Sequence, residues 1–132
     1  MLKAIVQEQL LGCGIACMAC VAGISYAKAV KMVPFKYVST IGCLCKDIVN
    51  ALKKLGLEYD YKKVTSKTKS YLKKEGTIVF IKRSTKYLRG HYLVKTNKGW
   101  MNPWINYPDI TPAKAGFINK LPGKAQWVIF KK

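Results

Sequence analysis

Residues 12–24 read GCGIACMACVAGI, and this stretch decides the fold. From Gly14 to Ile24 the sequence is apolar on nearly every side, so a helix over these residues must be buried all round. The glycines on either side of Cys13 predict a tight turn at the helix start, and Gly23 predicts its end. We therefore expect a buried helix against which the rest of the chain packs.

Two further helices are expected before residue 57. A short one is predicted over residues 26–32, before Pro34. Apolar side chains at three- and four-residue steps from Ile41 to Leu55 predict an amphipathic helix that ends at Gly56. Ser39-Thr40 is the expected N-terminal cap of that helix.

The second half of the chain has the pattern of a sheet. Alternating or compact apolar segments predict strands at 57–61, 77–82, 91–96, 100–104 and 126–131, with a hairpin turn at 97–99 and a short helix within 64–75. Helices followed by strands indicate an α+β fold in which the buried helix packs on an antiparallel sheet. We expect a single domain over residues 1–132.

The charge is strongly unbalanced. The 132 residues include 24 Lys+Arg and 6 Asp+Glu, which gives a formal net charge of +18. Only Arg83 and Arg89 are arginines, and lysine reads base edges poorly, so nucleic acid is not the favoured partner. The charge predicts a solvated surface or attraction to an acidic peptide or protein.

Five cysteines lie in the first third of the chain: Cys13, Cys17, Cys20, Cys43 and Cys45. Their spacing leaves a four-thiolate zinc site open, but the first cluster falls in a helix-like run without a turn between Cys17 and Cys20. We expect small buried side chains in a reducing compartment, and no metal or cofactor.

The N-terminus has one feature of a targeting signal. Leu10-Leu11-Gly12-Cys13 is similar to the cleavage site of a lipoprotein signal, but Gln7-Glu8-Gln9 interrupts the apolar stretch that such a signal needs. The longest apolar run, residues 10–24, is shorter than the roughly 20 residues of a membrane span. We expect a cytoplasmic protein with no transmembrane segment.

Cys13 and His91 are the strongest candidates for chemistry. Cys13 lies at the expected N-terminus of the buried helix, where the helix dipole favours a thiolate, so we expect its pKa to be lowered. His91 is the only histidine, and a neutral imidazole beside a thiol can take its proton and later protonate the leaving group.

Two amide side chains complete the candidate site. Asn102 lies across the 97–99 turn from His91, where its carbonyl can accept from the imidazole and fix the tautomer. Gln7 precedes Cys13 by a short segment, and its amide could donate to the oxygen of the carbonyl under attack, which is the oxyanion role.

These residues carry a resemblance to a known family. The stretch from Gln7 to Cys17, QEQLLGCGIAC, resembles the nucleophile motif of the papain-like cysteine peptidases that process bacteriocins by removing double-glycine leaders. Gly90-His91-Tyr92-Leu93-Val94 is similar to the family's catalytic-histidine strand, and Met101-Asn102-Pro103 falls where the family has Asp-Pro. The resemblance covers nearly the whole chain.

The resemblance implies a papain-like fold and a bacterial cysteine endopeptidase that cuts after a Gly-Gly-type leader site. It implies Cys13 as nucleophile, His91 as general base and acid, Asn102 as orienter and Gln7 as oxyanion donor. An acidic leader peptide is the implied substrate. The chain departs from the family pattern at Gly12, where the family has Asp, and at Asn102.

Two alternatives remain beside the peptidase. Small, very basic papain-like domains also resemble bacterial toxin or effector domains, which act on protein or RNA, are secreted or delivered, and are neutralised by an acidic immunity protein. The other alternative is a degenerate domain that binds peptides without cleaving them.

Overall fold

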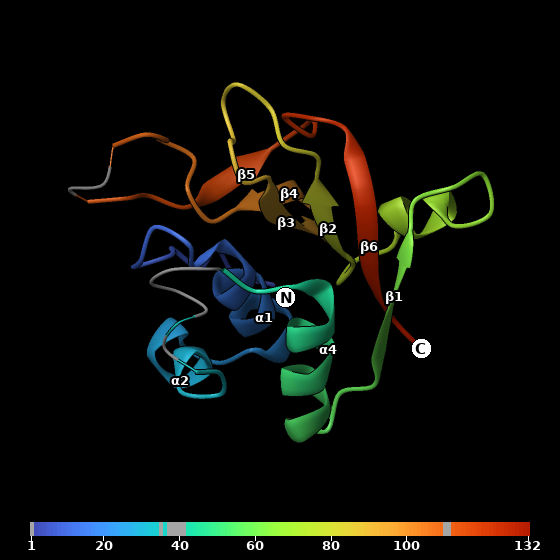
Figure 1. The fold of residues 1–132 in the computed structure, drawn as a ribbon, viewed down its shortest axis with the longest axis horizontal. Coiled ribbons are helices and arrows are strands. Elements are labelled where there is room, and N and C mark those ends of the chain that lie inside the picture. The colour runs from blue at the N-terminus through green and yellow to red at the C-terminus, as the bar shows by residue number, and fades with distance from the viewer. Residues whose placement is uncertain (1, 35, 37–41, 110–111) are drawn as a thin grey trace.

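The computed structural model describes residues 2–34, 36, 42–109 and 112–132. The described α-helices precede the strands along the chain, as Figure 1 shows. The described elements are α1 (Cys13–Ala22), α2 (Tyr26–Val30), α4 (Cys45–Lys54), β1 (Tyr59–Lys63), the 3-10 helix η1 (Lys69–Lys73), β2 (Ile78–Ile81), β3 (His91–Thr96), β4 (Gly99–Asn102), β5 (Gly116–Ile118) and β6 (Ala125–Lys131).

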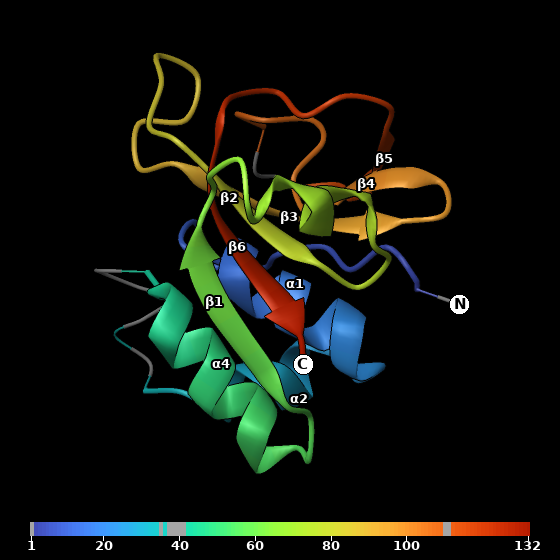
Figure 2. The ribbon, with the colours of Figure 1, turned by 90° about the vertical axis from the view of Figure 1, so that its right-hand side faces the viewer.

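The strands form one six-stranded sheet in the order β1-β6-β2-β3-β4-β5. Every neighbouring pair is antiparallel. The last strand, β6, lies between β1 and β2, as the quarter-turn view in Figure 2 shows. Figure 1 shows α1, α2 and α4 gathered on one side of the sheet, where α1 packs against β3 and α4 against β1. The predicted α+β class is confirmed.

Helix α1 is the buried helix that the sequence predicts. Its residues from Gly14 to Cys20 are all buried, because side chains on every face of this helix are apolar. The helix ends at Gly23, which takes the left-handed conformation with φ of 69°. The N–H of Ile24 then donates to the carbonyl of Ala19 at 3.1 Å and satisfies one of the terminal acceptors.

The other two helices are shorter than expected. Helix α4 begins at Cys45 and not at residue 41. The carboxylate of Asp47 accepts from the N–H of Leu44 at 2.8 Å, so a first-turn carboxylate caps the helix. The expected caps Ser39 and Thr40 lie outside the described residues. Helix α2 ends at Val30, before the predicted residue 32.

The strands follow the predictions closely, with one omission. The predicted hairpin that joins β3 to β4 is confirmed, with its turn at residues 97–98 and Gly99 already paired with Thr96. Strand β5 was not predicted, because its three residues are too short for an alternating signal. Gly99 makes room for β5, since a Cβ there would lie 2.4 Å from the carbonyl oxygen of Ile118. The β3–β4 hairpin matters most for the site, because it brings Asn102 back towards His91.

Candidate functional site

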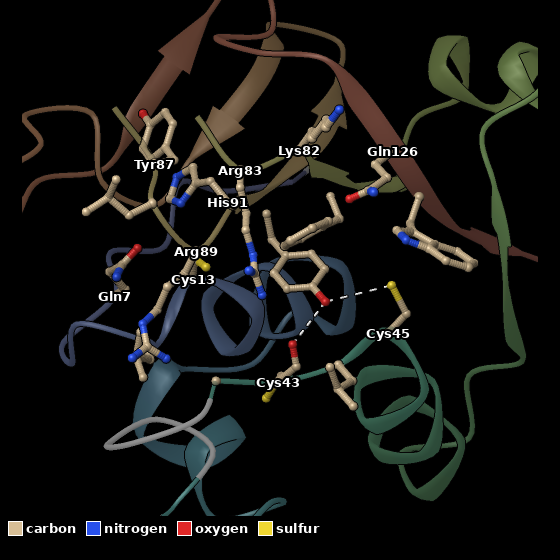
Figure 3. Close-up of a pocket in the computed structure, with 18 of the residues that line it drawn as sticks. Gln7, Cys13, Cys43, Cys45, Lys82, Arg83, Tyr87, Arg89, His91 and Gln126 are labelled. Carbon is tan, nitrogen blue, oxygen red and sulfur yellow. Dashed lines mark hydrogen bonds between the residues drawn. The ribbon is translucent and has the colours of Figure 1, made fainter. Parts of the chain in front are cut away.

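A pocket of about 930 Å³ opens between the start of α1, the start of α4 and strands β2, β3 and β6. Cys13, His91 and Gln7 all line it, although they come from distant parts of the sequence. Figure 3 shows the three labelled side chains in the same part of the pocket, whereas Cys45 and Gln126 lie in the opposite part of the view. The pocket therefore contains three of the four predicted site residues.

The fourth, Asn102, is buried and bonded to His91. Its Oδ1 lies 2.8 Å from His91 Nε2 and also 3.0 Å from the backbone nitrogen of Trp104. A backbone N–H can only donate, so the amide atom between the two must be the carbonyl oxygen. His91 Nε2 then carries the proton of the neutral ring, and Nδ1 is left as an acceptor. The structure thus brings Asn102 into contact with His91, and the orienting role of Asn102 stays a prediction.

His91 is buried and lies at one end of a series of packed aromatic rings. Tyr87 stacks on the imidazole with centroids 4.5 Å apart and an interplanar angle of 6°. Tyr107 packs on Tyr87, and Trp104 packs edge-on against Tyr107. Burial in this environment lowers the pKa of His91 to about 4, the hydrogen bond to Asn102 partly raises it, and the charge of Lys86 lowers it further. The imidazole is therefore neutral near neutral pH and able to accept a proton.

The buried neutral imidazole makes stability depend on pH. Below its ordinary pKa of 6.5 the histidine takes up a proton in the unfolded chain, while the folded protein resists protonation down to about pH 4. We expect the free energy of unfolding to fall by about 3 kcal/mol as the pH falls through this window. Denaturant unfolding at several pH values between 7 and 4 would measure this free energy.

The control is His91→Gln, which removes the only histidine in the chain. The variant should lose less stability than the wild type over the same pH range. The two proteins share the same Asp and Glu residues, so the contribution of those residues cancels in the comparison. Identical pH dependence in the two proteins would show that His91 is not held neutral by burial.

Cys13 is the first residue of α1, as predicted, but its thiol is not in the expected ionisation state. Burial raises its pKa above the ordinary value of 9.0. Hydrogen bonds from the backbone N–H groups of Tyr92, Gly14 and Cys13 itself lower the pKa, yet they do not offset burial. The expectation of a lowered pKa is therefore wrong, because it considered the helix dipole alone. The contact with Tyr92 nevertheless puts the sulfur beside the residue that follows His91.

Gly12 is explained by Tyr26. A Cβ at position 12 would lie 2.1 Å from the Tyr26 hydroxyl oxygen, so no larger residue fits there without movement. The same hydroxyl donates to Oε1 of Gln9, in the turn that leads to Cys13. The contact ties α2 to the turn before Cys13 through a neutral hydrogen bond.

Gln7 is buried and its side-chain amide is engaged with the backbone. Nε2 donates to the carbonyls of Gln9 at 3.0 Å and Leu10 at 3.1 Å. Both amide hydrogens are thus used, and donation to an oxyanion would require the amide to release one of them. Gln7 also joins the site through its backbone N–H, which donates to Pro103 at 3.3 Å.

The other cysteines are free thiols. Cys17 and Cys20 lie in the core of α1. The Tyr92 hydroxyl donates to the Cys43 carbonyl at 3.0 Å and lies 3.7 Å from the Cys45 sulfur, as the dashed lines in Figure 3 mark. Within residues 2–34, 36, 42–109 and 112–132, no three His, Cys, Asp or Glu residues group as metal ligands.

Sequence reasoning missed Tyr87, Tyr92 and Trp104. Tyr87 stacks on His91, and the backbone N–H of Tyr92 hydrogen-bonds to the Cys13 sulfur. The backbone N–H of Trp104 donates to Asn102 Oδ1 and so fixes the orientation of the Asn102 amide. Two of these contacts use backbone N–H groups, which carry no residue-type signal. The signal available in the sequence was position alone: Tyr92 directly follows His91, and Trp104 lies two residues after Asn102.

Comparison with protein-family models gave no match, and comparison with curated proteins gave none either. In the described part of the chain, no helix has the length and apolar character needed to cross a membrane.

Proposed function

We propose that this protein is a papain-like cysteine endopeptidase with Cys13 as nucleophile, His91 as general base and acid, and Asn102 as the residue that orients the imidazole. The observation that carries the proposal is the 2.8 Å contact between His91 Nε2 and Asn102 Oδ1, with the oxygen fixed by the Trp104 N–H. That contact leaves Nδ1 as a proton acceptor beside a pocket that Cys13 also lines.

The reaction starts from a neutral thiol and a neutral imidazole, because burial opposes the charged form of both. His91 takes the thiol proton as the Cys13 sulfur attacks the substrate carbonyl. Collapse of the adduct breaks the C–N bond, leaves an acyl-thioester on Cys13 and returns the proton to the departing amine. His91 then activates the water that hydrolyses the thioester.

The lining of the pocket favours an acidic, partly apolar peptide. The described lining residues include Lys46, Lys82, Arg83 and Arg89 but no Asp or Glu. Leu10, Leu44 and Leu88 line the same pocket and have exposed side chains. Carboxylates would meet the basic side chains, and apolar side chains would cover the leucines. The preference for a double-glycine site comes from the resemblance of the Gln7–Cys17 motif.

The test is a pair of acidic peptides, one with a Gly-Gly site and one in which both glycines are replaced by valine. The purified, reduced protein should cleave the first after the second glycine and leave the second intact, as mass spectrometry of the products would show. Failure to cleave either peptide would contradict the peptidase proposal. Equal cleavage of both would remove only the double-glycine preference.

A further inference from the structure

The orientation of the Gln7 amide is fixed by its neighbours. Two backbone carbonyls, those of Gln9 and Leu10, lie 3.0 and 3.1 Å from Nε2. A carbonyl oxygen can only accept, so the amide atom facing them must be the nitrogen. The side chain is 3% exposed, so it has little freedom to turn towards solvent.

The amide oxygen on the other side is unsatisfied. Among the described residues, Gln7 Oε1 is buried and has no hydrogen-bond partner. Leaving a buried acceptor unpaired is destabilising, so such atoms in native proteins call for an explanation. A donor that arrives with the substrate would supply the missing hydrogen bond.

The position of Gln7 decides which donor that is. Its side chain lines the same pocket as Cys13 and His91, and its backbone is bonded to Pro103, which follows Asn102. A peptide whose carbonyl carbon meets the Cys13 sulfur presents two polar atoms there, the carbonyl oxygen and the amide N–H. Gln7 Oε1 can only accept a hydrogen bond, so it would repel the oxyanion that develops on the carbonyl oxygen. It can accept a hydrogen bond from the amide N–H.

We propose that Gln7 Oε1 accepts the N–H of the scissile amide and so orients the leaving group, an inference that rests on the proposed function. When the C–N bond breaks, the nitrogen keeps this hydrogen and gains the proton held by His91, so it departs as an amine. The oxyanion is stabilised instead by the backbone N–H groups of Cys13 and Gly14, which lie beside the sulfur at the start of α1.

The experiment compares a peptide with its ester analogue, in which oxygen replaces the scissile N–H. Both substrates form an oxyanion, but only the amide can donate to Gln7. For Gln7→Ala we expect the ratio of kcat/KM for amide to kcat/KM for ester to fall about tenfold relative to wild type. Gln7→Met, which keeps the side-chain length without the acceptor, should lower the ratio similarly.

Equal losses of kcat/KM on amide and ester would overturn the inference, since an oxyanion donor or a purely structural residue affects both substrates alike. Because a ratio within one variant cancels the fraction of misfolded protein, a destabilised Gln7→Ala still gives a valid result. A wild type that cleaves neither substrate would instead overturn the proposed function, and the inference with it.

Discussion

Replacing Cys13 by alanine is expected to abolish peptide cleavage, with kcat/KM reduced by at least roughly 10⁴-fold. The variant removes the only thiol that lies at the N-terminus of α1 and contacts the Tyr92 N–H. No acyl-thioester can form without that sulfur, and the remaining groups can only polarise the substrate. Cleavage of a double-glycine peptide, followed by mass spectrometry, gives the measurement.

Cys20→Ala is the matched control. Cys20 lies on the same helix, but it is buried in the core and does not line the pocket. Its variant should cleave at close to the wild-type rate if it is folded, which thermal unfolding checks. Loss of cleavage in both folded variants, or in neither, would contradict the assignment of Cys13 as nucleophile.

His91→Gln is expected to lower kcat/KM by about 10³-fold. Glutamine can still donate to Asn102 Oδ1, but it cannot take a proton from the thiol or return one to the leaving amine. The remaining rate should rise with pH towards the raised pKa of Cys13, because the thiol must then ionise without a base. Rate measurements from pH 6 to pH 9.5 would reveal this change of profile.

Two substitutions of Asn102 are expected to have different effects on activity. Asn102→Asp keeps an oxygen that accepts from His91 Nε2, and it restores the residue type of the resembled family, so most activity should remain. Asn102→Leu has a similar size but no acceptor, so His91 loses the contact that fixes its tautomer, and kcat/KM should fall about 10–100-fold. Equal activity of the two variants would show that the 2.8 Å contact has no role in the reaction.

The parts of the fold that sequence predicts are those set by local pattern. Helix α1 followed from an apolar run, and the proximity of His91 to Asn102 followed from one hairpin turn, whose register pairs Val94 with Met101. Strand β5 was too short to recognise, and the position of β6 between β1 and β2 depends on long-range pairing that no local pattern encodes.

The protonation states of Cys13 and His91 could not be predicted from the sequence for a similar reason. The position of Cys13 at a helix start is a local feature and favours a thiolate, whereas burial raises the pKa and depends on how the rest of the chain folds around the sulfur. Tyr87, which stacks on His91, is itself packed against Tyr107 from the other side of the hairpin. Only the folded chain shows that both groups start neutral.

Trapping the covalent intermediate tests the central claim most directly. A slowly hydrolysed activated ester of a glycine-ending acyl peptide, mixed with the protein and quenched in acid, should leave one acyl group attached through a thioester. After digestion, mass spectrometry should locate it on the peptide that contains Cys13, and His91→Gln should accumulate it much more slowly. An acyl group at Cys43 or Cys45, or equal labelling with and without His91, would contradict a Cys13 nucleophile activated by His91.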